Sequence, residues 1–164
     1  MTDRTLPAVY RAPQRSRDVH VPAFAGVHRA LDQGLCGMGG ALATPPESAD
    51  GAVARLDTEY GERVARRVLR FAGASDGSWV WTRDEDEAYW VGRLAGPWRY
   101  DGSPAALAAD LVHVRACTWG SRPLGGRDVP AAVLATFARG GLNWQRIRAS
   151  DVSEATARAW PLVS

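Results

Sequence analysis

Tryptophan and arginine side chains gather in the middle of this 164-residue sequence. Five of its seven tryptophans lie within residues 79–119, with arginines between them: Trp79, Trp81, Trp90, Trp98 and Trp119. Indole rings stack on flat ligands such as nucleobases, and guanidinium groups make bidentate contacts with phosphates. The same composition suits a dense core, because a single tryptophan is more often a core residue than a ligand wall. If the protein has a binding surface for flat ligands, we expect it in residues 79–119.

The positive charge is carried by arginine alone. All 20 basic residues are arginine, and with 18 acidic residues the net charge is +2. One interpretation is a GC-rich gene, since alanine, glycine and proline are also abundant. The other is a surface suited to nucleic acid, because guanidinium groups both bind phosphates and stack on bases. The two interpretations are compatible.

Period-two alternation predicts that the tryptophans lie on β-strands. Trp79, Trp81 and Arg83 would share one face of a strand, with Val80 and Thr82 on the other. Residues 84–87 are acidic and predict a solvated turn into a second strand over residues 89–94, so the two strands should form a hairpin. Gly96 and Pro97 should end that strand, after which Trp98 and Tyr100 share a face.

A further strand is predicted over residues 110–119. Val112, Val114 and Ala116 should face the core, while Leu111, His113 and Arg115 occupy the opposite face. Several closely spaced strands after a helix favour an α+β fold, with a small curved or closed β-barrel and helices packed outside it.

The flanking segments predict helices and one glycine-rich strand. A helix spans residues 53–71, with an apolar stripe at spacings of three and four, arginines outside the stripe and Gly61 as a candidate break. Residues 34–40, GLCGMGG, predict either a strand closely approached by backbone or ligand, or a turn. Shorter helices are expected from about residue 130, capped by Asp128, and from Asp151, where Glu154 gives capping-box spacing.

We expect one domain over residues 19–164, beginning with an edge strand at residues 19–24. Residues 1–18 contain four arginines among proline, serine and glutamine, and predict a mobile arm that is solvated or trails along phosphates. No apolar run approaches the roughly 20 residues of a membrane span, and no signal-peptide pattern is seen. These features predict a cytoplasmic protein with no membrane partner.

The sequence indicates no catalytic or metal chemistry. Cys36 and Cys117 have no CxxC partner, which favours buried free thiols. The acidic residues 84–87 are consecutive and diverge from one another, so we expect no metal site there. Cys117 and His113 are too far apart along a strand for proton transfer within it. We expect no cofactor and no enzyme activity.

Three segments resemble the EVE, YTH and ASCH-type domains of the PUA-like superfamily, especially those associated with restriction and defence nucleases. They are GSWVWTRDEDEAYWVGRLAGPWRY, ADLVHVRACTW and VPAAVLATF, and with GLCGMGG the similarity covers residues 19–148. The resemblance implies a small β-barrel that binds DNA or RNA, in several members by enclosing a modified or flipped base in an aromatic pocket. Where related domains place an aromatic residue after the glycine motif, this chain has Met38, Gly39 and Gly40.

Applied to this chain, the resemblance predicts a reader of nucleic acid without catalysis. Trp79 and Trp81, with Trp98 or Trp119, would wall the pocket, and His113 or Thr82 would contact the edge of the base. The predicted phosphate contacts are Arg83, Arg93, Arg99 and Arg115. A reader of this kind acts by occupying its target or through a separate effector protein such as a nuclease. Binding of a planar small molecule, or of a protein, is the alternative.

Overall fold

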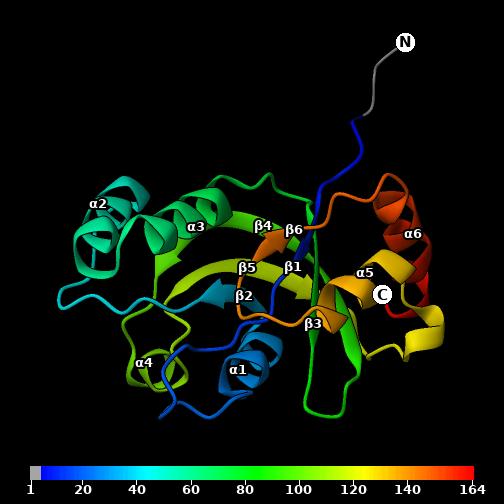
Figure 1. The fold of residues 1–164 in the computed structure, drawn as a ribbon, viewed down its shortest axis with the longest axis horizontal. Coiled ribbons are helices and arrows are strands. Elements are labelled where there is room, and N and C mark those ends of the chain that lie inside the picture. The colour runs from blue at the N-terminus through cyan, green and yellow to red at the C-terminus, as the bar shows by residue number, and fades with distance from the viewer. Residues whose placement is uncertain (1–4) are drawn as a thin grey trace.

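The computed structural model describes residues 5–164, and its centre is a six-stranded mixed sheet (Figure 1). The spatial order is β2-β5-β4-β3-β1-β6, and only β1 and β3 pair in parallel among the described strands. The strands are β1 (Val9–Arg11), β2 (Leu35–Met38), β3 (Trp79–Arg83), β4 (Tyr89–Tyr100), β5 (His113–Trp119) and β6 (Gln145–Arg146). Within residues 5–164 no pairing joins the edge strands β2 and β6. The chain is therefore α+β, with a curved sheet that is not closed into a barrel.

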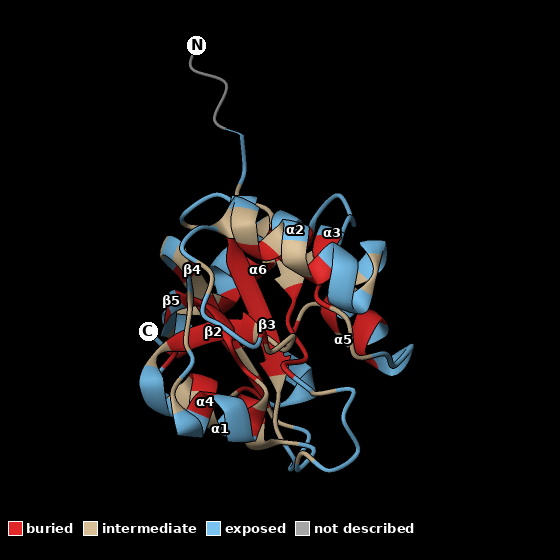
Figure 2. Cartoon of the chain, turned by 90° about the vertical axis from the view of Figure 1, so that its left-hand side faces the viewer, coloured by how far each residue is buried: buried red, intermediate tan, exposed pale blue. Residues whose placement is uncertain are grey.

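Helices cover both faces of this sheet, so its strands are buried in the middle of the molecule (Figure 2). One core cluster joins β1, β3 and β4 to α5 and α6, and two others lie under α2 and α3 on the opposite face. Helices α1 and α4 pack on each other beside β2. The helices are α1 (Ala25–Gln33), α2 (Ala49–Tyr60), α3 (Glu62–Gly73), α4 (Pro104–Ala109), α5 (Ala131–Ala138) and α6 (Val152–Ala159), with short 3₁₀ turns at Gly126–Asp128 and Trp160–Leu162.

Several predicted elements are confirmed. The hairpin forms between β3 and β4, with Trp79 opposite Arg93 and Arg83 opposite Tyr89. The long helical pattern divides into α2 and α3 at Gly61, whose φ of 96° favours glycine. The GLCGMGG segment forms β2, which pairs with β5.

β4 is longer than the sequence predicts. Gly96 and Pro97 do not end the strand but introduce an irregularity in its pairing with β5, where Gly96 adopts a φ of 66°. Between Ala95 and Arg99, β4 has two more residues than the facing part of β5, as in an enlarged β-bulge, and the strand continues to Tyr100. The first part of β4 pairs with β3, and most of its length pairs with β5.

The faces of β5 differ from the predicted division. His113 and Arg115 are as buried as Val114, whereas Ala116 is exposed. Helices cover both faces of the sheet here, so alternation with solvent is lost. Polar side chains on a strand of this kind must find partners inside the protein.

The N-terminal segment is not a mobile arm throughout. Residues 9–11 form β1 between β3 and β6, and Val9, Arg11 and Ala12 are buried. A three-residue strand gives almost no periodic signal, and its partner Trp79 lies far along the chain. Residues 1–4 of the predicted arm lie outside the described residues.

Two smaller expectations are also corrected. Residues 19–24 form turns ahead of α1, not an edge strand. Neither Asp128 nor Asp151 caps a helix through its side chain: Asp128 lies in a 3₁₀ turn, and Pro130 holds the cap position of α5. Proline fixes the backbone angle there without a side-chain cap.

Candidate functional site

Trp79 and Trp81 lie in the core beneath the C-terminal helices. The indole of Trp81 is 0% exposed, and its Nε1 donates to Thr156 Oγ1 of α6 over 3.1 Å. Trp79 packs on Trp160 with ring centroids 5.4 Å apart, and the Arg93 guanidinium lies 4.3 Å from its ring centroid. Both rings stabilise the packing of β3 against α6. A base would reach them only after the C-terminal helix had moved.

Trp98 and His113 are brought together on the opposite face. Trp98 Nε1 donates to His113 Nδ1 over 3.3 Å, so Nε2 of His113 carries the proton and donates to the Gly40 carbonyl over 2.9 Å. Burial lowers the pKa of His113, against the opposing effects of that hydrogen bond and of Asp110. A neutral His113 therefore fixes the Gly39–Gly40 backbone from behind.

The remaining predicted contacts to a base lie apart from this pair. Thr82 is fully buried, and its Oγ1 has no hydrogen-bond partner among the described residues. Trp119 is half-buried and donates to the Leu35 carbonyl over 2.8 Å, while Trp90 donates to Asp84 in the β3–β4 turn. The tryptophan cluster therefore does not converge on one cavity, and a role for these residues in base binding stays a prediction.

Three of the four predicted phosphate arginines have internal contacts. Arg115 is 2% exposed and donates to the carbonyls of Phe71, Ala74 and Gly96 and to Asp76. Arg93 donates to the Gly77 carbonyl, and Arg83 lies over the rings of Tyr89 and Phe137. Arg99 is exposed. Of the four, Arg99 is the one presented to solvent.

A different set of residues surrounds a partly open cavity of about 330 Å³. We call it the Gly39 cavity, because the glycine motif that follows β2 forms one wall. Residues 15–18 and residues 142–144 form other walls, together with side chains of α2, α3 and α4. Its lining includes Met38, Gly39, Gly40, Tyr60, Arg67, Asp110, Asn143 and Trp144.

Asp110 supplies a negative group to this cavity. Its carboxylate accepts hydrogen bonds from the Ser16 hydroxyl over 2.6 Å and from the Gly40 N–H over 3.3 Å. A Cβ at position 39 would collide with that carboxylate, so glycine is required for the close approach. Each carboxylate oxygen has two acceptor positions. Asp110 therefore retains acceptor capacity for an N–H group of a ligand.

Two aromatic side chains line the same cavity. Tyr60 is 49% exposed, and its hydroxyl donates to the Ala41 carbonyl over 2.6 Å, which fixes the ring. Burial, followed by the charge of Asp110, raises the pKa of Tyr60, so the phenol stays protonated. Trp144 is 8% exposed and stacks on Tyr10 at 4.1 Å. Tyr10 covers one face of this indole, so a ligand meets Trp144 as a wall.

Arginines gather at the rim of the cavity. Arg15 lies over the Phe24 ring, and Arg17 donates to the Asn143 side chain. Burial lowers the pKa of Arg67, and the like charges of Arg17, Arg63 and Arg70 lower it further. These charges lie close enough to repel one another. An anion placed among them would be stabilised.

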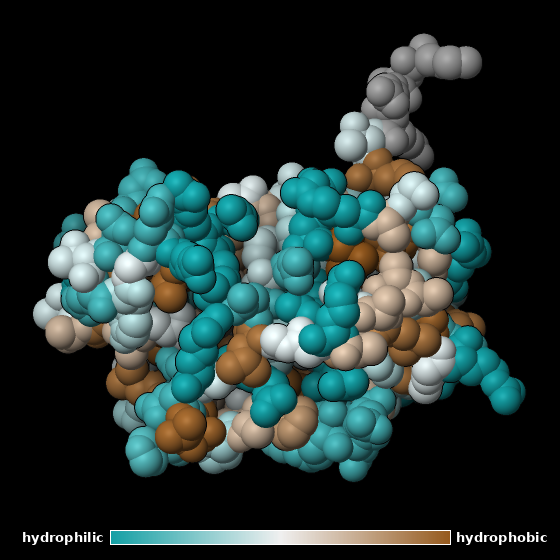
Figure 3. Space-filling view, in the orientation of Figure 1, coloured by the Kyte–Doolittle hydropathy of each residue, from teal (hydrophilic) through white to brown (hydrophobic). Residues whose placement is uncertain are grey.

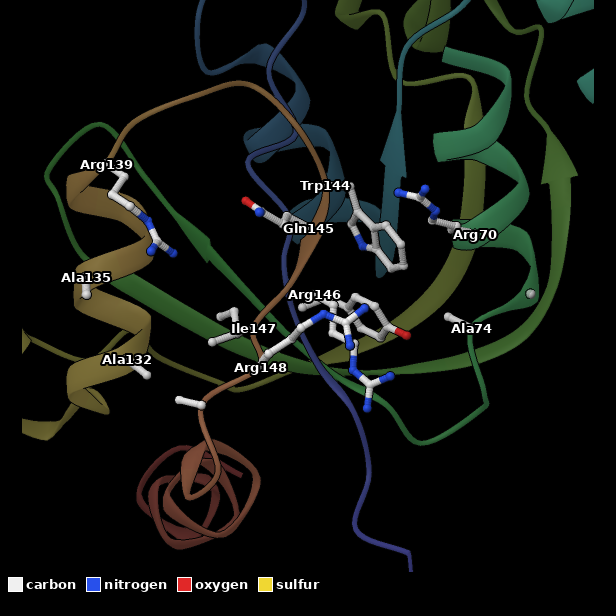
Figure 4. Close-up of a pocket in the computed structure, with 13 residues that line it drawn as sticks. Arg70, Ala74, Ala132, Ala135, Arg139, Trp144, Gln145, Arg146, Ile147 and Arg148 are labelled. Atoms are coloured by element: carbon white, nitrogen blue, oxygen red, sulfur yellow. The ribbon is translucent and has the colours of Figure 1, made fainter. Parts of the chain in front are cut away.

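A second, open hollow of about 950 Å³ adjoins Trp144 between α3 and α5 (Figure 4). We call it the arginine groove. Arg139 projects from the end of α5 and Arg70 from α3, while Arg146 and Arg148 extend from the segment between them. Small residues, Gly73, Ala74, Ala132, Ala135 and Ala149, form much of the remaining lining.

Sequence patterns gave little indication of either hollow. Several of the residues that line the hollows come from short or irregular segments: Tyr10, Arg139, Trp144, Arg146 and Arg148. Chain topology brings these segments together, because it places β1 and β6 side by side. Arg146 and Arg148 are two residues apart, so they lie on one face of an extended segment. This spacing is the sequence pattern that groups the pair. For the Gly39 cavity, the sequence signal is the glycine motif.

Residues 5–164 contain no group of three or more His, Cys, Asp or Glu side chains placed to hold a metal ion. No helix in the same range is both long and apolar enough to cross a bilayer. Cys36 and Cys117 are buried free thiols, and burial raises the pKa of each.

No protein-family model matches the sequence, and no curated protein matches it closely enough to indicate a relative.

Proposed function

We propose that this protein binds nucleic acid without catalysis and holds one unpaired base in the Gly39 cavity. The observation that carries the proposal is the convergence of three kinds of group on one partly open cavity of about 330 Å³. Asp110 offers an acceptor, Tyr60 and Trp144 offer aromatic walls, and Arg15, Arg17 and Arg67 provide positive charge at the rim. Together these groups match the edge, the faces and the phosphate of a nucleotide.

The chemistry of each part supports a base that donates hydrogen bonds. A carboxylate accepts from amino groups such as cytosine N4, whereas uracil and thymine present a carbonyl oxygen at that position. Stacking on an aromatic side chain contributes about 1–3 kcal/mol per base. A base paired in a duplex presents neither its faces nor its pairing edge, so it must be unpaired or flipped.

We also propose that the chain is related to the PUA-like superfamily and has the nucleic-acid-binding role that this relationship implies. The curved sheet with peripheral helices supports that relationship, although the sheet is open. The ligand is DNA or RNA, with a modified base as a candidate, and a separate effector protein is the proposed partner. In this arrangement Trp98 and His113 position Gly40 rather than contact the base.

Equilibrium binding to cytidine- and uridine-containing oligonucleotides tests the proposal, with tryptophan fluorescence as the signal. We expect tighter binding of the cytidine oligonucleotide, by about tenfold, and weaker binding when its complement pairs the base. Asp110→Asn should reduce cytidine affinity by about tenfold and narrow the preference over uridine. Tyr60→Leu changes an exposed side chain and should weaken both oligonucleotides.

Asp86→Asn is the matched control, because Asp86 is an exposed carboxylate in the β3–β4 turn and lies outside the cavity lining. It should bind like the unmodified protein. Equal binding by the unmodified protein and by folded Asp110→Asn and Tyr60→Leu would contradict the proposal. Saturable binding of a free nucleotide with no gain for an oligonucleotide would favour the small-molecule alternative.

A further inference from the structure

The arginine groove adjoins the Gly39 cavity at Trp144 and differs from it in charge. Trp144 lines both hollows, so the two are neighbours at this side chain. The cavity lining contains two carboxylates, Asp18 and Asp110, beside its three arginines, whereas the groove lining contains four arginines and no acidic residue. The groove is also the larger and more open hollow. It therefore fits an extended anion better than a single small one.

The four groove arginines are available to a ligand. Arg70, Arg139, Arg146 and Arg148 are exposed, and their guanidinium groups form no hydrogen bond or ion pair with another side chain among the described residues. They lie on two sides of the hollow and between those sides (Figure 4). Hydrophilic side chains gather on the corresponding face, over α3 and the β6 segment (Figure 3). Charges held this way favour an anion that contacts several of them together.

The remaining lining permits close approach. Gly73, Ala74, Ala132, Ala135 and Ala149 have side chains no larger than a methyl group. Small side chains leave room for a bulky chain to lie between the arginines. Gln145 adds a neutral hydrogen-bonding group beside them.

We infer that the arginine groove binds the phosphates of a single nucleic-acid strand that flank the base held in the Gly39 cavity. This inference rests on the proposed function, since the strand is identified by the base in the cavity. It adds a second binding surface, formed by Arg70, Arg139, Arg146 and Arg148. A single strand fits because the base in the cavity must be unpaired and the groove adjoins the cavity at Trp144.

The test separates the two hollows by ligand length. Cytidine monophosphate can occupy the cavity alone, whereas a cytidine oligonucleotide of about eight residues can also reach the groove. The groove variant combines Arg139→Gln, Arg146→Gln and Arg148→Gln. Its matched control combines Arg122→Gln, Arg127→Gln and Arg158→Gln, three exposed arginines outside both linings. Both variants lose the same charge.

We expect the groove variant to bind the oligonucleotide at least tenfold more weakly at low salt and the monophosphate unchanged. The slope of log affinity against log salt should become shallower by about 2, because each phosphate contact on a single strand contributes about 0.7. The control variant should retain the slope. Asp110→Asn should weaken both ligands.

Equal loss of oligonucleotide binding in the groove and control variants would overturn the inference, because it would show a general effect of net charge. An unchanged groove variant with a weakened Asp110→Asn would overturn the groove and leave the proposed function standing. Binding of neither ligand by the unmodified protein would count against the proposed function itself. An acidic peptide that bound the groove with the same salt slope would overturn the assignment to nucleic acid.

Discussion

Two sets of arginines in this protein have different roles. Arg11 and Arg115 are buried and donate to main-chain carbonyls at the C-terminal ends of α5 and α3: Arg11 to those of Thr136 and Gly140, Arg115 to those of Phe71 and Ala74. The arginines of the groove lie at the surface around a hollow. The first set completes the fold, and the second is left to meet a ligand.

The comparison shows how one residue type can have two roles under the same electrostatic rule. The last carbonyls of a helix have no partner within the helix and carry partial negative charge. Arg11 and Arg115 satisfy that need from neighbouring strands. Within residues 5–164 the groove arginines donate no hydrogen bond to such a carbonyl, so their positive potential remains for an external anion.

The largest effect on stability should follow from removing Arg115. Arg115→Met leaves the carbonyls of Phe71, Ala74 and Gly96 without their donor in a buried site. We expect a loss of about 3–5 kcal/mol in the free energy of unfolding, measured by urea titration. Arg99→Met, on the neighbouring strand and exposed, should change stability by less than about 0.5 kcal/mol. Similar losses in the two variants would show that the buried contacts of Arg115 do not stabilise the fold.

Removing Arg11 should cost slightly less but disturb the groove. Arg11 joins β1 to the end of α5 and to the Asn143 carbonyl. Asn143 directly precedes residues 144–149, which line the arginine groove. Arg11→Met should lose about 2–4 kcal/mol by urea titration, because several carbonyls lose a charged donor. Hydrogen exchange should also speed up at residues 139–148. If exchange there stayed unchanged, Arg11 would not hold this segment.

His113 should make stability depend on pH. Burial lowers its pKa in the folded state, so the unfolded chain takes up a proton more readily. Its contribution is complete above about pH 6.5, the ordinary histidine value, and declines as the pH falls from there toward the folded-state pKa. His113→Gln should flatten this dependence in unfolding titrations at a series of pH values, while the exposed His20→Gln should preserve it. An unchanged profile in His113→Gln would contradict the assignment.

The smallest stability effect is expected for the groove arginines. The triple change Arg139→Gln, Arg146→Gln and Arg148→Gln removes exposed side chains and should alter the free energy of unfolding by about 0.5 kcal/mol or less per site. Thermal unfolding at two salt concentrations measures this change. Relief of like-charge repulsion should offset part of this loss at low salt. A loss of several kcal/mol would place these arginines in the structural set.

The sequence predicted elements with a strong period and missed those set by topology. The β3–β4 hairpin, β2 and the paired helices α2 and α3 follow from alternation, helical spacing and Gly61. β1 and β6 contain three and two residues, and their pairing depends on partners distant in the chain. Sequence alone offers no periodic signal for strands that short.

The site shows the same limit. Trp81, Arg93 and Arg115 have the residue types of a nucleotide pocket, yet each is used inside the protein, because helices cover both faces of the sheet. Residue type alone does not distinguish a buried arginine that donates to the end of a helix from an exposed arginine at the surface. The glycines before Ala41 were identifiable, but Asp110 and Trp144 become their neighbours only through the fold.

Mapping of amide chemical-shift changes on titration with a short single-stranded cytidine oligonucleotide tests the proposed location most directly. Binding at the two hollows predicts the largest changes at Gly39, Gly40, Asp110 and residues 143–148. Changes confined to Trp79, Trp81 and α6, or no changes at saturating oligonucleotide, would contradict it.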